Sequence, residues 1–315
     1  MIEDYMVRTD LDNELAAAPA HGSAYFITAS DQIRLRIGVW QDANAKKGTI
    51  FLLPGRADFI EKLGHAVTDL HAEGYAVCVL EFRGLGLSDR LLTDKRAGHV
   101  DEFLDYQMDV EAMLSAAKSL GLPKPWNLLG NSMGGCIGLR AVVDGKPFTA
   151  CAFTSPMWGI QLSPILRIIA PIITGSIRFA GKGHVYALGK NGENETLAWS
   201  FDENEITGDA DMFDHLQQVN RAVDDHWIGG PTYGWLQQAL KETKALSKCA
   251  SPNLRAITFS AELDQLVEQS AIEQRMARWP DGEYESISGA RHDLLRAGGD
   301  VRTSVLKKIV DFFDA

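Results

Sequence analysis

The chain has 315 residues, enough for one large α/β domain that carries an insertion. Its formal net charge of −11 argues against a protein that binds nucleic acid. Acidic residues interrupt the first 22 residues where a signal peptide would have its apolar core, and no later run is long and apolar enough to span a bilayer. The four cysteines lack metal-ligand spacing. We therefore expect a soluble cytoplasmic protein.

Short apolar runs alternate with helix-like segments along most of the chain, after an N-terminal arm (residues 1–22) that reads as loosely held. Residues 33–40 alternate apolar and polar side chains, which predicts one solvent-facing side. The expected strands are 25–28, 33–40, 49–53, 76–80, 126–130, 148–153, 255–260 and 284–287. The expected helices are 59–72, 100–120, 133–144, 268–278 and 301–313. This alternation predicts an α/β fold with a mostly parallel sheet that is covered on both faces.

The alternation stops between residues 156 and 246, where no strand-like run occurs. We predict a helical cap there, inserted into a core made of residues 23–155 and 247–315. Residues 156–192 are rich in isoleucine and leucine and contain four bases and no acid. One interpretation is a cap whose apolar face packs on the core. The other is an apolar, mildly basic surface that touches lipid.

A Gly-x-Ser-x-Gly pattern runs from Gly130 to Gly134, between an apolar strand and a helix of small residues. A serine at such a sharp turn is exposed at the end of the strand, and glycine tolerates the crowding on both sides. The pattern predicts Ser132 as a nucleophile, with the N–H of Met133 directed at an oxyanion. The alternative is a glycine-rich loop before an ordinary helix, so partners elsewhere in the chain must decide.

A serine hydroxyl needs a base to accept its proton and an acid to orient that base. Asp264 and His292 each follow a late strand, and the order Ser132, Asp264, His292 is the one expected for this kind of site. Each has an alternative interpretation. Asp264 could be a loop or helix-cap acid, with Glu262 as the competing orienting acid, and His292 could be a surface histidine.

The oxyanion needs a second N–H donor, which we assign to Arg56 in the loop after the strand 49–53. The side chain of Arg56 either meets a substrate phosphate or is solvated. Gly84 and Gly86 lack the third glycine of a dinucleotide fingerprint, so no cofactor is expected. No cluster with metal-ligand spacing occurs, so no metal is expected either.

Together these stretches resemble serine hydrolases of the α/β-hydrolase superfamily, in the group of monoacylglycerol lipases and bacterial lysophospholipases. The stretches that carry the resemblance are 53–62, 82–90, 130–135, Asp264 and 289–295. The resemblance implies an α/β-hydrolase fold with a helical cap, with Ser132 as nucleophile, Asp264 as acid and His292 as base. Two positions depart from it. Pro54 stands where histidine is frequent, and Glu81 stands where aspartate is usual.

The resemblance implies hydrolysis of a carboxylic ester of a single-chain lipid, either a lysophospholipid or a monoacylglycerol, through an acyl-enzyme on Ser132. An alternative with the same three residues is a small-ester or lactone hydrolase, or an acyltransferase. A ligand-binding protein on this fold is a further alternative, which an intact triad disfavours. The expected partners are the lipid ester and a transient membrane contact through the cap. No sequence feature sets the head group or the oligomeric state.

Overall fold

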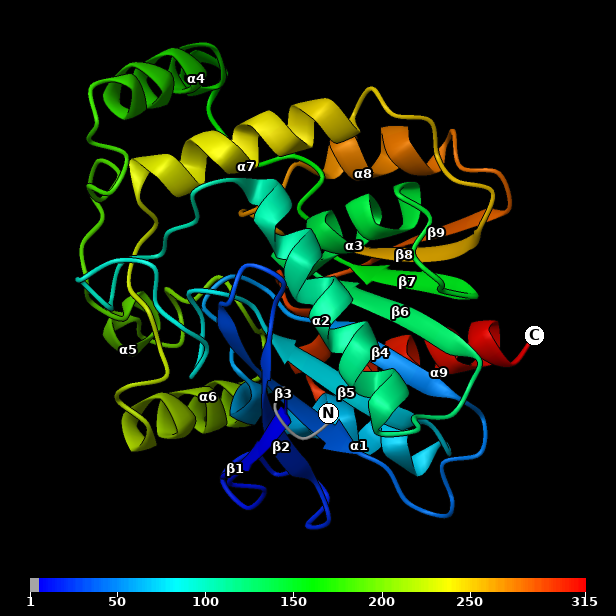
Figure 1. Cartoon of the computed structure of the whole chain (residues 1–315). Coiled ribbons are helices and arrows are strands. Elements are labelled where there is room, and N and C mark those ends of the chain that lie inside the picture. The colour runs from blue at the N-terminus through cyan, green and yellow to red at the C-terminus, as the bar shows by residue number, and fades with distance from the viewer. Residues whose placement is uncertain (1–5) are drawn as a thin grey trace.

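Nine strands form a single sheet in the computed structural model, which describes residues 6–315 (Figure 1). They are β1 (Met6–Thr9), β2 (Ser23–Thr28), β3 (Arg34–Trp40), β4 (Thr49–Leu53), β5 (Ala76–Glu81), β6 (Trp126–Asn131), β7 (Ala150–Thr154), β8 (Arg255–Ala261) and β9 (Gly282–Ile287). Their order across the sheet is β1-β2-β3-β5-β4-β6-β7-β8-β9. The pairs from β1 to β5 along this order are antiparallel, and those from β5 to β9 are parallel. The predicted mostly parallel sheet is confirmed.

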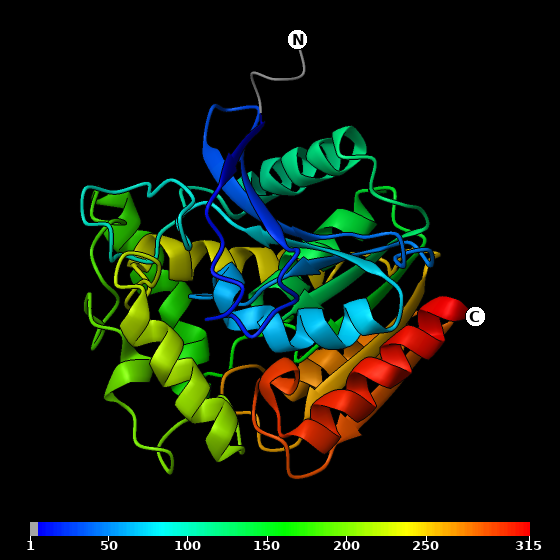
Figure 2. The ribbon, with the colours of Figure 1, turned by 90° about the horizontal axis from the view of Figure 1, so that it is seen from below.

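Helices cover both faces of the sheet, which explains why the central strands are apolar along their whole length. On one face α1 (Gly64–Ala72) and α9 (Gly299–Asp314) lie side by side (Figure 2). On the other face α2 (Tyr106–Ser119), α3 (Met133–Val143) and α8 (Gln269–Met276) pack into a second apolar cluster. Short 3-10 turns, η1 (Ile60–Leu63), η2 (Phe103–Asp105) and η3 (Leu294–Arg296), precede α1, α2 and α9.

The prediction that one side of β3 faces solvent is wrong at Arg36, whose side chain is only 1% exposed. Its guanidinium pairs with Glu61 at 2.7 Å and with Glu81 at 3.0 Å, so its charge is compensated inside the protein. Glu81 also accepts hydrogen bonds from the backbone N–H groups of Ile60 and Leu87. The residue that departs from the family pattern therefore joins the loops that follow β4 and β5.

Four helices lie between β7 and β8: α4 (Pro164–Phe179), α5 (Glu195–Ala198), α6 (Ala210–Ala222) and α7 (Tyr233–Leu246). They gather at the carboxyl ends of the parallel strands (Figure 1). They occupy the segment that we predict as a cap, and its bounds as a domain stay a prediction.

The first interpretation of the cap, an apolar face packed on the core, does not hold for α4. Only Ala170 and Thr174 are buried along this helix, whereas Ile168 is 72% exposed and Ile172 66% exposed. In Figure 1 the helix lies above α7 and away from the sheet. Its aliphatic side chains therefore form an exposed apolar surface.

The N-terminal arm is held more closely than its composition predicts. Residues 1–5 lie outside the described residues, but β1 pairs with β2 and is the edge strand of the sheet. Farther along, the indole N–H of Trp40 donates to the side chain of Asn13 at 3.2 Å. The reason is edge pairing, a non-local contact that the local sequence does not display. Within residues 6–315, no helix is both long and apolar enough to cross a membrane.

Candidate active site

Ser132 occupies the sharp turn between β6 and α3, with φ 51° and ψ −116°. A positive φ is strained for serine, and the turn is held by a hydrogen bond from the N–H of Ser132 to the carbonyl of Thr154 at 3.0 Å. Neighbouring glycines allow close backbone approach: a Cβ at Gly134 would lie 2.0 Å from the carbonyl oxygen of Leu53. The geometry is the strand-to-helix turn that the sequence predicts.

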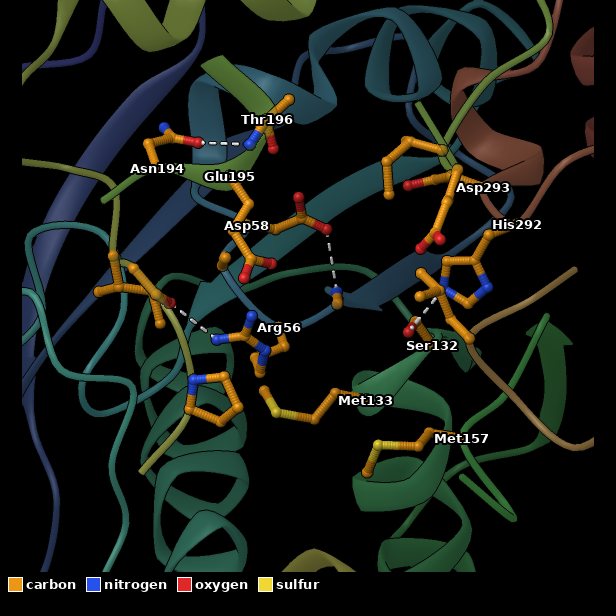
Figure 3. A pocket seen from close by; sticks show the side chains of 18 of the residues that line it. Arg56, Asp58, Ser132, Met133, Met157, Asn194, Glu195, Thr196, His292 and Asp293 are labelled. Carbon is orange, nitrogen blue, oxygen red and sulfur yellow. Dashed lines mark hydrogen bonds between the residues drawn. The ribbon is translucent and has the colours of Figure 1, made fainter. Parts of the chain in front are cut away.

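The side chains of Ser132, His292 and Asp264 form a continuous hydrogen-bonded chain. The imidazole Nε2 of His292 lies 2.9 Å from the Ser132 hydroxyl oxygen, and its Nδ1 lies 2.6 Å from Oδ2 of Asp264. Figure 3 shows the imidazole above the serine at one end of a cavity. The three residues come from three separate loops at the carboxyl ends of β6, β8 and β9, where the sheet topology brings them together.

The contacts of these residues bear on the alternative interpretations of Asp264, Glu262 and His292. His292 is 4% exposed and so is not a surface histidine. The other oxygen of Asp264, Oδ1, accepts the backbone N–H groups of Leu266 and Val267, which fixes its carboxylate. Glu262 instead accepts from the hydroxyl of Ser288 and the N–H of Gly289, so it contacts the histidine loop but not the imidazole.

The pKa of His292 is raised above its usual value by a balance of opposing effects. Burial lowers the pKa because it penalises the imidazolium, but the hydrogen bond and the charge of Asp264 raise it by more. Asp264 therefore stabilises the protonated imidazole. A histidine that acts as a general base needs this stabilisation when it is protonated.

Two backbone N–H groups beside Ser132 are free to stabilise negative charge. Within residues 6–315, neither Met133 N–H nor Arg56 N–H donates to a protein acceptor. Met133 is the first residue of α3, where N–H groups lack intrahelical partners. The loop of Arg56 passes close to the serine, since a Cβ at Gly55 would lie 3.3 Å from Cβ of Ser132. Both residues line the cavity that Ser132 also lines.

A buried polar network, which we did not predict from the sequence, holds the loop that contains Arg56 in place. Asp58 accepts the N–H of Gly55 at 3.1 Å and pairs with Arg296 at 2.9 Å. Arg296 also pairs with Asp293, which neighbours His292 in sequence, and Asp293 accepts from Asn131 at 3.4 Å. The network therefore links the loop after β4, the turn at the end of β6 and the loop after β9. In the sequence, its members lie close to the predicted site residues, and this proximity is the only indication of the network that the sequence offers.

Ser132 and His292 line a cavity of about 670 Å³, which lies beneath the helices between β7 and β8. Its apolar lining, called the apolar wall below, consists of Met157, Ile160, Trp235, Leu236, Leu266 and Val267. A polar wall is formed by Lys190, Asn191, Glu193, Asn194, Glu195 and Thr196, and Figure 3 shows Arg56 between Glu195 and Met133. The cavity thus offers an apolar surface and a polar surface to one ligand.

A group of potential metal ligands occurs elsewhere among the described residues. His21, Asp42 and His71 place their ligand atoms within 4.8 Å of one another. None of the three lines the cavity. The cavity itself is bordered by the serine, the histidine and the carboxylates described above, an arrangement suited to nucleophilic attack by an oxygen.

Comparison with known proteins assigns the chain to a family. The model of the family described as serine aminopeptidase, S33, matches residues 44–297. The chain belongs to this family. The match covers the serine turn, both partner loops and the loop of Arg56, so the site described above lies within the matched residues.

Curated relatives and solved structures extend the comparison. A probable lysophospholipase L2 of Haemophilus influenzae is 27% identical over 276 residues, 87% of this S33 chain and 86% of the relative. Lysophospholipase L2 of Escherichia coli K12 is 28% identical over 280 residues, 84% of this chain and 80% of the relative. A solved monoglyceride lipase of Saccharomyces cerevisiae is 18% identical with a TM-score of 0.69, over 98% of this chain and 94% of that one. The predicted α/β-hydrolase fold is confirmed.

Proposed function

We propose that the protein is a serine hydrolase that cleaves the carboxylic ester of a single-chain lipid, a lysophospholipid or a monoacylglycerol. The observation that carries the proposal is the Ser132–His292–Asp264 chain of hydrogen bonds, which opens into a cavity with an apolar wall. The relatives named lysophospholipase and monoglyceride lipase support the choice of substrate class.

In this proposal Ser132 is the nucleophile and His292 is the general base. His292 accepts the hydroxyl proton as the serine oxygen bonds to the ester carbonyl carbon, and the N–H groups of Met133 and Arg56 stabilise the resulting oxyanion. His292 then donates the proton to the departing alcohol, which leaves the acyl group on Ser132. Asp264 holds the imidazole in the tautomer that both steps require.

The second half of the reaction repeats the same proton transfers with water. His292 removes a proton from a water molecule, whose oxygen attacks the acyl carbonyl, and Ser132 regains its proton as the fatty acid leaves. The apolar wall that contains Met157 and Ile160 supports an acyl chain as the group bound through this step. An acyltransferase would replace this water with an alcohol, and a small-ester or lactone hydrolase would not need apolar lining for an acyl chain.

A substrate series tests this proposal. We expect kcat/KM to rise about tenfold or more between butyrate and dodecanoate esters of the same alcohol, because each added buried methylene contributes about 0.8 kcal/mol. The series pairs p-nitrophenyl esters with monoacylglycerols and lysophospholipids of matched chain length. An amino-acid p-nitroanilide serves as the amide control. Highest activity on the butyrate ester would contradict the proposal and select the small-ester alternative.

We further propose that the exposed surface of α4 contacts the lipid aggregate that supplies the substrate. Its exposed side chains are Ile165, Leu166, Ile168, Ile169, Ile172, Ile173 and Phe179. Two bases, Arg167 and Arg178, lie on the same helix, which carries no acid. Because the whole chain is strongly acidic, contact with an anionic bilayer must be local and mainly apolar.

The double variant Ile168→Asp with Ile172→Asp tests the contact. Each isoleucine buried against lipid contributes about 1.5–3 kcal/mol, so activity on long-chain substrate in vesicles should fall tenfold or more. Activity on a soluble butyrate ester should stay within about twofold of the wild-type value, because Ser132, His292 and Asp264 lie outside α4.

The matched control for this variant is Val7→Asp, which changes an exposed apolar residue of β1 far from α4 (Figure 1). It should leave both activities unchanged. An equal loss on both substrates in the folded double variant would mean that α4 is only structural, and no loss on either would place the lipid contact elsewhere.

We also propose a reducing, cytoplasmic environment for the protein. All four cysteines are free thiols, and Cys78, Cys136 and Cys151 are buried. Burial raises the pKa of the Cys78 thiol to about 12, so it has little reactive thiolate. Buried, unpaired thiols of this kind support a compartment that does not form disulfides.

A further inference from the structure

The guanidinium of Arg56 lines the cavity without a compensating carboxylate. Its Nη1 donates to the carbonyl of Gly229 at 3.0 Å, and its Cζ lies 5.7 Å from the ring centre of Trp235. Within residues 6–315, no carboxylate oxygen lies within 4.0 Å of it. A guanidinium has five N–H donors and is always charged, so the single hydrogen bond to Gly229 leaves most of these donors available to a ligand in the cavity.

Among the cationic side chains that line the cavity, some have carboxylate partners and others do not. Arg296 pairs with Asp58 and Asp293, and Lys190 pairs with Glu195 at 2.6 Å. Lys62 resembles Arg56, because its ammonium donates only to the carbonyl of Ala57 at 3.0 Å. Two cationic side chains in this part of the cavity wall therefore lack an ion-pair partner.

Burial makes both of these cations costly. It lowers the pKa of Lys62 to about 7, against the attraction of Asp58, and the charges of Arg296 and Arg56 lower it further. Burial also lowers the pKa of Arg56, with Glu195 as the largest opposing influence, although that carboxylate lies beyond ion-pair distance. An anion bound in the cavity beside these cations would relieve this cost, since an unpaired buried charge is strongly unfavourable.

We propose that Arg56 binds the phosphate of a single-chain phospholipid whose carboxylic ester is attacked by Ser132. This inference rests on the proposed function and specifies the head group within it. A guanidinium can contact two phosphate oxygens at once, which gives both strength and orientation. The preferred substrates are then lysophospholipids, and monoacylglycerols are poorer substrates because they place a neutral hydroxyl in the same position.

The position of Arg56 in the chain supports this assignment. Its backbone N–H is the proposed oxyanion donor, so its guanidinium lies one side-chain length from the ester carbonyl. In a lysophospholipid the glycerol carbons separate the ester from the phosphate by a comparable number of bonds. One residue thus contacts both the reacting carbonyl, through its backbone, and the head group, through its side chain. Figure 3 shows the guanidinium directed away from Ser132, toward the polar wall that contains Glu195.

A ratio of activities tests the assignment. The probes are a 1-acyl-glycerophosphate, a 1-acyl-glycerophosphocholine and a 1-monoacylglycerol with one short acyl chain, all used as monomers. In Arg56→Gln, kcat/KM for either phosphate substrate divided by that for the monoacylglycerol should fall about 10- to 100-fold, the range expected for lost hydrogen bonds to a charged group. The ratio cancels any loss that the substitution causes in the shared chemistry.

Two further variants sharpen the result. Arg56→Lys should restore part of the ratio, because it keeps the charge but not the two-point contact. Arg34→Gln removes an exposed cation that pairs with Asp89 outside the cavity, so the ratio should stay within about twofold. An unchanged ratio in Arg56→Gln would overturn the proposal, and so would an equal loss in Arg34→Gln, which would indicate a general effect of positive charge.

Inhibition separates a failure of this proposal from a failure of the proposed function. sn-Glycerol 3-phosphate should compete with a soluble butyrate ester in the wild type and about tenfold more weakly in Arg56→Gln, whereas glycerol should not compete. Inorganic phosphate in a parallel arm shows whether the glycerol part is needed. If none of the three lipids is hydrolysed but this Arg56-dependent inhibition remains, the phosphate site stands and the lipid function fails. If the lipids are hydrolysed and the inhibition is independent of Arg56, the phosphate site fails alone.

Discussion

Replacing Ser132 by alanine is expected to lower kcat for lysophospholipid hydrolysis by roughly six orders of magnitude, the scale seen when a serine nucleophile is removed from such a site. The reason is that no other hydroxyl lies within hydrogen-bond distance of Nε2 of His292 among the described residues. The residual activity would come from the cavity and the oxyanion donors acting on water. Steady-state kinetics with a monomeric substrate measures the effect.

The matched control for Ser132→Ala is Ser155→Ala. Ser155 is also buried and follows Thr154, the residue that holds the N–H of Ser132, but its own hydroxyl has no partner within residues 6–315. Loss of this hydroxyl should change kcat less than tenfold. A folded Ser132→Ala protein that keeps more than a hundredth of wild-type activity would contradict the assignment of the nucleophile.

Replacing Asp264 by asparagine should lower kcat by about four orders of magnitude, as in other serine triads. The amide would present an N–H to Nδ1 of His292, which favours the tautomer whose Nε2 carries the proton. That nitrogen could then no longer accept the proton of Ser132. The backbone N–H groups of Leu266 and Val267 can still bind the amide oxygen, so the loop should keep its shape.

Glu262→Gln is the control for this variant. It removes a charge from the same loop, and its amide oxygen can still accept from Gly289, so kcat should change less than tenfold. The opposite ranking of the two variants, with both folded, would transfer the orienting role to Glu262.

The pH dependence of kcat/KM is an independent test of the interaction between His292 and Asp264. Only neutral His292 can accept a proton, so activity is lost as the pH falls through the pKa of this residue. Asp264 raises that pKa in the wild type. Its neutral replacement should therefore move the acidic limb of the profile to lower pH, while Glu262→Gln should leave the limb in place.

The sheet and the three proposed catalytic residues were predictable because their signals are local. Apolar runs identified the buried strands, the glycines around Ser132 identified a sharp turn, and Asp264 and His292 stand directly after late strands. In a parallel sheet the carboxyl ends of the strands lie at one edge, so residues that are distant in sequence could be expected to meet.

Other features depend on contacts that the local sequence does not display. Arg36 looks like a solvent-facing residue of a strand, and only the position of Glu61 and Glu81 in the fold makes its burial favourable. The pairing of Arg296 with Asp58 joins residues 238 positions apart. The exposure of α4 was also open, since its isoleucines fit both a buried and an exposed helix. Aliphatic content alone does not say what covers a face.

Mapping the covalent adduct of a fluorophosphonate probe tests the central claim most directly. The probe traps an activated serine, so peptide mass spectrometry locates the nucleophile without assuming a substrate. We predict one adduct, on Ser132, in the wild type and in Ser155→Ala, and none in Ser132→Ala. An adduct on another residue, or equal labelling of Ser132→Ala, would contradict the proposal that this S33 hydrolase acts through Ser132.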